Sequence, residues 1–285
     1  MIITIIGATG VLGRNLLPRL LERGHEIRAV VRRKEQADYL ERLGIQSYVG
    51  DILDAGTLAQ PLKDSDCVVH AATAIPDDLA RGDWTMNDRI RREGTRNLIE
   101  QSQRMHVRRY IQQSITMLYG DYGTRIADES FPLQPSPYIQ SALDMEESVK
   151  KSGLDWCILR GGYFYGPMTG LEKNWREGAK AGTLRIPSNS NALVSLIHVA
   201  DMAQAMVAAA ENAPAQSIYN VVDDQPVRYS ELITYVARLE EGPDPVSGDA
   251  VVPSLGCSNG KIKRELEWQP FFPSYRSGLA LTERD

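Results

Sequence analysis

Short apolar runs recur along the first half of the chain, separated by longer segments of mixed polarity. The first run, residues 2–6, is rich in β-branched residues and too short to cross a bilayer, which is typical of a buried central strand. Similar runs predict strands at 26–31, 46–49, 67–70, 109–113 and 156–160, with helices such as 12–23 between them. This alternation predicts an α/β fold with a doubly wound parallel sheet, whose right-handed crossovers place helices on both faces.

Three closely spaced glycines follow the first strand. Gly7 and Gly10 allow the backbone to approach phosphate groups, and Gly13 allows the next helix to pack closely on the strand. The start of that helix adds unpaired amides and a partial positive charge. The turn therefore predicts a site for the pyrophosphate of a dinucleotide, formed by Gly7, Thr9, Gly10, Val11, Leu12 and Gly13.

The regular alternation ends near Arg160. Gly/Pro-rich segments follow, a helix is predicted at 199–211, and irregular chain is predicted around Pro243, Pro245, Pro253, Pro270 and Pro273. The length of 285 residues suits one large α/β domain with a smaller addition. We expect residues 1–165, together with 196–221, to form the dinucleotide-binding domain, and 166–195 with 222–285 to form a smaller C-terminal substrate-binding lobe.

Composition excludes several classes of function. The net charge is −5 and opposite charges are interspersed, which argues against a general nucleic-acid-binding surface. Cys67, Cys157 and Cys257 lie far apart without CxxC spacing, and no apolar stretch is long enough for a membrane helix, so we expect a reduced, cytoplasmic protein without a membrane partner. The four histidines show no i,i+4 spacing, so no metal site is predicted.

An ordered set of short motifs follows the glycines: Gly50-Asp51-Ile52, His70-Ala71-Ala72, Gly94-Thr95-Arg96-Asn97-Leu98, Tyr119-Gly120, Ser136-Pro137-Tyr138, Leu159-Arg160-Gly161, Tyr165-Gly166-Pro167 and Ile197-His198-Val199-Ala200-Asp201. With these motifs the chain resembles the extended short-chain dehydrogenase/reductase family, which includes nucleotide-sugar epimerases and dihydroflavonol-type reductases, over almost its whole length. The resemblance implies a Rossmann fold, a small-molecule substrate and, as in many relatives, a homodimer. It also implies that Asp51 and Ile52 contact the adenine, that Ala71 and Ala72 line the cofactor, and that Gly161, Gly162, Tyr163 and Phe164 run past the nicotinamide.

The end of the second predicted strand indicates the cofactor. An acidic residue there would bind the ribose 2′-hydroxyl of NAD, but this position is Val31. Arg32 and Arg33 follow, and guanidinium groups suit a 2′-phosphate through charge-assisted hydrogen bonds. The sequence therefore predicts NADP(H) in preference to NAD(H). The alternative is a solvated basic face that includes Arg28 and Lys34.

The catalytic motif of the family is incomplete in this chain. Its Tyr-x-x-x-Lys pattern falls on Tyr138 and Ala142, so the tyrosine is present and the lysine is missing, and its serine falls on Ile115, between Ser114 and Thr116. An unperturbed tyrosine with a pKa of about 10 is only about a thousandth phenolate at neutral pH. Tyr138 therefore suits proton donation during carbonyl reduction better than proton removal from an alcohol. Ser114 or Thr116 is a candidate replacement donor, although strand alternation lets only one side face the cofactor.

Arg91 is a further candidate. It lies three residues before Gly94, where relatives usually carry an asparagine near the active site. Its guanidinium would replace part of the lost positive charge or bind an anionic group of the substrate. The alternative is that Arg89, Arg91, Arg92 and Arg96 form one solvated helix face.

Candidate substrate-pocket residues come from segments that commonly form lids. They are Trp84, after the loop at 75–83, and Tyr163, Phe164, Met168 and Trp175. Aromatic residues at such positions serve equally well in simple packing.

These observations predict an NADPH-dependent reductase of a carbonyl or enone in a small organic metabolite. Two alternatives stay open: a redox-neutral isomerase, dehydratase or cyclase on the same fold, and a non-catalytic NADP(H)-binding sensor. Nucleotide-sugar epimerisation ranks lower, because it begins with oxidation of a hydroxyl group and needs an effective base.

Overall fold

The computed structural model describes residues 1–76 and 82–281. The chain divides into two compact units. The first unit comprises Met1–Ser114, Pro137–Leu159 and Ala203–Ile218, and the second comprises Ile115–Ser136, Arg160–Met202 and Tyr219–Asp285.

A seven-stranded sheet with the order β11-β6-β5-β4-β1-β2-β3 is built mainly from the first unit. Its strands are β1 (Ile2–Ile6), β2 (Glu26–Val31), β3 (Gln46–Val49), β4 (Cys67–His70), β5 (Arg109–Ile115), β6 (Asp155–Gly161) and β11 (Ser217–Val221). β1 pairs in parallel with β2 and β4, so that Ile3 lies opposite Ile27 on one side and Cys67 on the other. The six strands predicted from the sequence are thus confirmed, whereas β11, which buries the polar Ser217 and Asn220, was not predicted.

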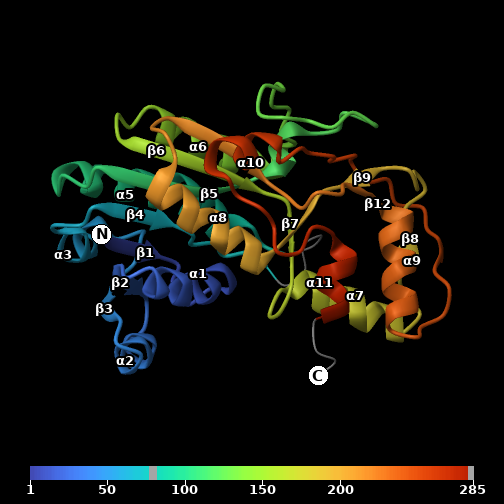
Figure 1. The fold of residues 1–285 in the computed structure, drawn as a ribbon, viewed down its shortest axis with the longest axis horizontal. Helices are drawn as coiled ribbons and strands as arrows, with labels where there is room; N and C mark the ends of the chain where they lie inside the picture. Colours follow the sequence, from blue (N-terminus) through green and yellow to red (C-terminus); the bar gives the residue numbers. More distant parts are fainter. Residues whose placement is uncertain (77–81, 282–285) are drawn as a thin grey trace. The chain divides into compact units, whose positions relative to one another are not determined.

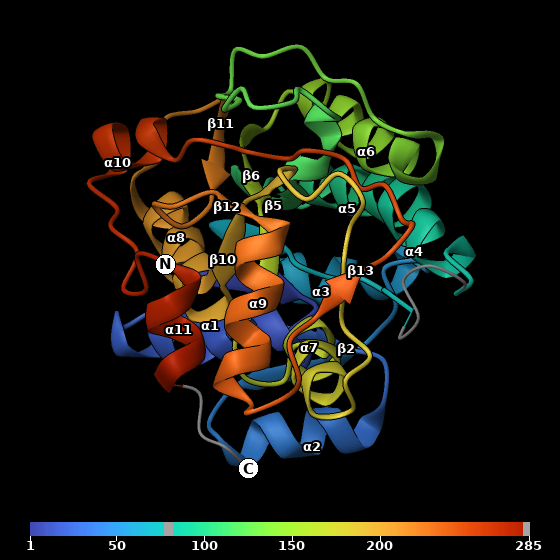
Figure 2. The same ribbon diagram turned by 90° about the vertical axis from the view of Figure 1, so that its right-hand side faces the viewer.

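Helices cover both faces of this sheet. They are α1 (Val11–Glu22), α2 (Lys34–Arg42), α3 (Ala59–Leu62), α4 (Thr85–Arg89), α5 (Thr95–Arg104), α6 (Gln140–Lys150) and α8 (Val199–Asn212). Both views show α1 and α8 on one face and α5 and α6 on the other (Figure 1, Figure 2). Apolar residues that include Ile6, Val30, Leu98, Tyr110 and Ile158 form the core between the strands and the helices. The predicted doubly wound, Rossmann-like fold is confirmed.

The second unit has short strands and four helices in its described part. Its strands pair as β7 (Tyr163–Tyr165) with β10 (Leu196–His198), β9 (Leu193–Val194) with β12 (Val227–Arg228), and β8 (Arg185–Ile186) with β13 (Val246–Ser247). Its helices are α7 (Gly170–Lys180), α9 (Tyr229–Leu239), α10 (Gly260–Leu266) and α11 (Tyr275–Leu281). The five prolines from Pro243 to Pro273 lie in irregular chain as predicted, whereas the helices α9, α10 and α11 before, between and after them were not predicted.

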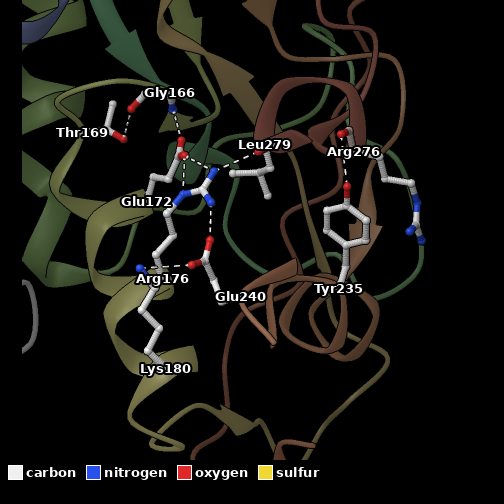
Figure 3. Close-up of polar contacts among 9 residues, drawn as sticks. All are labelled: Gly166, Thr169, Glu172, Arg176, Lys180, Tyr235, Glu240, Arg276 and Leu279. Atoms are coloured by element: carbon white, nitrogen blue, oxygen red, sulfur yellow. Dashed lines mark hydrogen bonds and ion pairs between the residues drawn. The ribbon is translucent and has the colours of Figure 1, made fainter. Parts of the chain in front are cut away.

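A buried ion-pair cluster joins three helices of this unit (Figure 3). Arg176 of α7 pairs with Glu172 at 2.7 Å and with Glu240 just after α9, and it donates a 2.8 Å hydrogen bond to the carbonyl of Leu279 in α11. The side chains of Glu172 and Glu240 are only 4% and 3% exposed. Glu172 also accepts the Gly166 N–H at 2.7 Å. One guanidinium therefore neutralises two buried carboxylates.

None of the described helices is both long and apolar enough to span a membrane. Within residues 1–76 and 82–281 there is no group of three His, Cys, Asp or Glu side chains that would hold a metal ion. Cys67, Cys157 and Cys257 are free and buried. Burial raises the pKa of the Cys67 and Cys257 thiols to about 12, so neither is a reactive thiolate at neutral pH.

Candidate functional site

The glycine turn between β1 and α1 has no room for side chains at two of its positions. Gly7 has a φ of +99°, and a Cβ there would lie 2.6 Å from the carbonyl carbon of Ala71 and the nitrogen of Ala72. A Cβ on Gly13 would lie 2.3 Å from the carbonyl oxygen of Gly7. The first turn of α1 therefore packs directly on the end of β1, which requires glycine at both positions.

The N-terminus of α1 is left without a cap. Gly10 provides no side-chain acceptor, the first turn holds no acidic residue, and Gly10 itself is exposed. Val11 is half-buried and Leu12 is buried. The first amides of a helix have no intrahelical acceptor, so this end is suited to an anion such as a pyrophosphate.

Arg32 and Arg33 lie at the end of β2 and the start of α2, and both side chains are exposed. Within the described ranges neither guanidinium forms an ion pair with a carboxylate. Gln36, in the first turn of α2, donates a 3.2 Å hydrogen bond to the hydroxyl of Thr9 on the glycine turn. This bond ties the start of α2, just after Arg32 and Arg33, to the glycine turn.

The residues that follow β3 and β4 include the other cofactor candidates of the first unit. Ala71 and Ala72 follow β4 and form the surface against which Gly7 packs. Ile52 is buried against Gly94, and its carbonyl accepts a 3.0 Å hydrogen bond from Asn97. The carboxylate of Asp51 accepts a 2.9 Å hydrogen bond from the Leu53 N–H and so stabilises the turn in which Asp51 lies.

Tyr138 and Ala142 occupy very different environments. Tyr138 lies in the short 3₁₀ turn Pro137–Ile139 and its side chain is 84% exposed. Ala142, at the position of the family lysine, is fully buried in α6. The structure therefore places no charge at the lysine position to favour the phenolate of Tyr138.

The three candidates around the serine position have separate surroundings. In the first unit, the Ser114 hydroxyl donates a 2.7 Å hydrogen bond to the buried Glu146. In the second unit, Thr116 hydrogen-bonds the Cys257 thiol. Ile115, between them, is half-buried. Both hydroxyls thus have partners within the protein.

Arg91 is buried, and the solvated-face interpretation is wrong for this residue. Only 6% of it is exposed, and its Nη1 lies 3.3 Å from the Ser141 hydroxyl. Arg89, by contrast, is surface-exposed and pairs with Glu93 at 2.9 Å. Arg91 lies in the π-helical turn Ile90–Gly94 between α4 and α5, and this turn packs on α6.

The second unit holds the remaining candidates. Gly161 and Gly162 are buried, and a Cβ on Gly162 would lie 2.6 Å from the carbonyl oxygen of Ser195. Tyr163 is half-buried, and its hydroxyl is hydrogen-bonded to the hydroxyl of Tyr229. Burial raises the pKa of Tyr163, so its phenol is neutral.

The aromatic pocket candidates differ in exposure. Phe164 is half-buried with its ring against Gly161, and Trp175 is half-buried beside the core of the second unit. Met168 is 60% exposed. Trp84, in the first unit, is half-buried at the start of α4, and residues 77–81 of the preceding loop lie outside the described residues.

Sequence reasoning missed Asn87, Ser141, Glu146 and Tyr229. Asn87 and Glu146 are fully buried polar residues inside helical segments, and nothing in a sequence pattern signals that a polar residue is buried. Ser141 stands between the motif positions Tyr138 and Ala142 and is missed because the family motif leaves it variable. Tyr229 lies beyond the segment where strand and helix patterns were readable.

The fold and the glycine turn define a dinucleotide-binding protein. The sequence pattern of the family described as NAD(P)H-binding matches residues 7–213, so the chain belongs to that family. The resemblance to extended short-chain dehydrogenases/reductases is confirmed by relatives and by solved structures of epimerases and dehydratases.

Two relatives named as reductases cover nearly the whole chain. The 3-diazoavenalumate denitrifying reductase of a Streptomyces species is 31% identical over 98% of this chain and 99% of its own length. The 4-hydroxy-2-methyl-3-oxo-4-farnesyl-3,4-dihydroquinoline-1-oxide ketoreductase of Stigmatella aurantiaca is 26% identical over 99% of this chain and 86% of its own length. Among solved structures, the UDP-glucose 4-epimerase of Thermus thermophilus in complex with NAD has a TM-score of 0.82, with 22% identity over 99% of this chain and 97% of that chain. At that identity the likeness concerns the fold.

Proposed function

We propose that the protein is an NADPH-dependent reductase that acts on a carbonyl or enone-type carbon of a small organic metabolite. The observation that carries the proposal is the uncapped start of α1 with the unpaired Arg32 and Arg33 close to it. The amides of α1 bind the pyrophosphate and the two guanidinium groups bind the 2′-phosphate. When bound, NADPH supplies the hydride.

The surroundings of Tyr138 support the direction of the reaction. Because Ala142 carries no charge, nothing at that position favours removal of the Tyr138 proton, and the phenol is ready to donate it to an oxygen that gains negative charge. Reduction needs such a donor, whereas oxidation needs a base. The two relatives named as reductases agree with this direction.

The cofactor part of the proposal is tested by fluorescence titration with NADPH, NADH and NADP⁺. We expect Arg32→Glu and Arg33→Glu each to weaken NADPH binding by about 10- to 100-fold and NADH binding by much less, since each removes a charge-assisted contact to the 2′-phosphate. Arg104→Glu, an equal charge change at an exposed position in α5, is the control and should leave both affinities unchanged. Equal affinities of the wild-type protein for NADPH and NADH would refute the preference.

The chemical part is tested by NADPH consumption with a panel of ketones and enones. For a substrate found in this way, Tyr138→Phe should lower turnover by about 100- to 10,000-fold while NADPH affinity stays the same. Tyr39→Phe, which changes another exposed tyrosine, is the control. Unchanged turnover in Tyr138→Phe would show that another group donates the proton. NADPH binding without consumption on any substrate would favour the sensor.

A further inference from the structure

In the described part of the chain, the buried guanidinium of Arg91 has no carboxylate partner. Among residues 1–76 and 82–281 no carboxylate lies within ion-pair distance of it, and its hydrogen bond to Ser141 is long at 3.3 Å. The neighbouring carboxylate of Asp88 is engaged elsewhere, because it accepts the Ser141 hydroxyl at 2.6 Å and lies 3.7 Å from Arg92. Among the described residues the Ser141 hydroxyl is thus the one protein acceptor for the five N–H donors of Arg91, and none of the Arg91 nitrogens is both unsatisfied and sealed off from solvent.

Arg91 nevertheless remains charged at neutral pH. Burial lowers its pKa to about 10, while the nearby Asp88 opposes this effect. A buried cation without a partner is costly, so proteins rarely keep one unless a metal, a partner side chain or a ligand supplies the missing charge. Arginine is also the residue whose planar fork matches a carboxylate with two parallel hydrogen bonds.

Asn87 provides an independent second observation. It lies four residues before Arg91, a spacing that places both side chains on the same face of the helical segment. Asn87 is fully buried; its Oδ1 accepts the Ala74 N–H at 3.0 Å, but its Nδ2 has no hydrogen-bond partner in the described part of the chain. Unsatisfied buried donors of this kind are rare in folded proteins and indicate a missing acceptor. Among the described residues, Asn87 therefore has an unsatisfied donor close to a guanidinium that has one long hydrogen bond.

The local backbone is also unusual at this point. The five residues Ile90–Gly94 form a π-helical turn inside an otherwise α-helical segment that runs from Thr85 to Arg104. Such turns are rare and are found frequently at functional sites. Arg91 lies in this turn and contacts Ser141 of α6.

We propose that Arg91 and Asn87 bind a carboxylate group of the substrate, so that the enzyme reduces small organic acids. Arg91 supplies the charge and a planar pair of donors, and the Nδ2 of Asn87 supplies a further donor. Ser141 and Asp88 are positioning residues, because the Ser141 hydroxyl links the Asp88 carboxylate to the guanidinium. This proposal rests on the proposed reductase function and names its class of substrate.

The test is calorimetric titration of the wild-type protein, saturated with NADPH, with acetate, benzoate and cinnamate, and with methyl benzoate as the uncharged match. We expect at least one carboxylate to bind and methyl benzoate not to bind. Arg91→Gln should weaken the binding of the carboxylate by about 10- to 100-fold, as expected for loss of a charged hydrogen-bonded contact. Arg89→Gln, which removes the exposed and already paired neighbour, is the matched control and should bind as the wild type does.

Two further arms separate the alternatives. If Arg91 instead bound a phosphate of the cofactor, Arg91→Gln would weaken the binding of NADPH as much as it weakens the binding of benzoate. Inorganic phosphate would then also compete with NADPH. Either result would overturn the proposal. If Arg91→Gln does not fold, Arg91→Lys keeps the charge without the planar fork and should still weaken benzoate by at least about fivefold. No binding of any of the three carboxylates to the wild-type protein would also overturn it.

The same titrations show which proposal fails. If the wild-type protein does not bind NADPH but binds benzoate in a way that depends on Arg91, the proposed reductase function is refuted and the proposed carboxylate site remains. NADPH binding without carboxylate binding would refute only the carboxylate site.

Discussion

The hydroxyl of Ser114 donates a 2.7 Å hydrogen bond to the fully buried carboxylate of Glu146. Ser114 is on β5, one residue before the family's serine position, and Glu146 is on α6, one turn after Ala142. A buried carboxylate depends on its hydrogen bonds, because leaving it unsatisfied is costly. Ser114 therefore connects α6 to the sheet.

We expect Ser114→Ala to lower the free energy of unfolding by about 1–3 kcal/mol, because it removes a hydrogen bond from a buried charge. NADPH affinity and turnover of the folded variant should stay unchanged. Ser148→Ala is the control: its hydroxyl donates only to the Asp144 carbonyl of its own helix, and its cost should be within about 0.5 kcal/mol. Urea unfolding measures both. Unchanged stability with lost turnover would instead place Ser114 at the substrate.

Gly13→Ala tests the phosphate site through packing. The added Cβ would lie 2.3 Å from the Gly7 carbonyl oxygen, so the turn must shift. We expect NADPH affinity to fall by at least about tenfold and the free energy of unfolding to fall by about 1–3 kcal/mol. Gly170→Ala is the matched control, because a Cβ there meets nothing within 4 Å and the backbone is not strained. Full NADPH affinity in Gly13→Ala would mean that the nucleotide binds elsewhere.

The strands β1 and β4 could be predicted because each is a β-branched, largely apolar run next to a turn signal, as burial in a parallel sheet demands, whereas the edge strand β3 is mostly polar and has no buried residue. The helices of the second unit could not be predicted in this way. In α7, Glu172 is buried only because Arg176 neutralises it, so the helix does not show a continuous apolar face. Ion pairing between elements that are distant in sequence leaves no local pattern.

Within the candidate site, too, some features could be predicted from the sequence and others could not. The glycine turn was readable because its constraints are local and steric, and the structure shows them at Gly7 and Gly13. Arg91 stands among arginines that resemble a solvated face, and its burial depends on a π turn and on α6, which lies about fifty residues further along the chain. The strong exposure of Tyr138 likewise depends on tertiary structure that its motif does not encode.

Arg176 tests the stability of the second unit. Arg176→Met would leave the buried carboxylate of Glu172 without its cation and Glu240 with only the exposed Lys180, and we expect a loss of about 3–5 kcal/mol. Lys180→Met is the control: Lys180 pairs with Glu240 at 3.3 Å but is 60% exposed, so its loss should cost at most about 1 kcal/mol. Thermal and urea unfolding measure both. Adding Glu172→Gln and Glu240→Gln to Arg176→Met should restore part of the stability, whereas equal effects of Arg176→Met and Lys180→Met would contradict this account.

Asp223 should make stability fall as the pH rises from about 4 to about 8. It is buried, its Oδ1 accepts the Gln225 N–H at 3.2 Å, and its Oδ2 has no hydrogen-bond partner in the described residues. Burial, reinforced by the neighbouring carboxylates of Asp224 and Asp201, raises its pKa to about 8.

An unfolded aspartate has a pKa of about 3.9, so between about pH 4 and pH 8 the folded chain holds a proton that the unfolded chain lacks. The free energy of unfolding therefore falls as pH rises through this window and levels off above it. Asp223→Asn is neutral throughout and should lose this part of the pH dependence. Asp224→Asn, which removes an ion pair with Lys263 at 2.9 Å, should keep the wild-type slope. Urea midpoints at several pH values between about 5 and 9 decide the matter, since an Asp223→Asn slope equal to that of the wild type would show that Asp223 is ionised in the folded protein across this range.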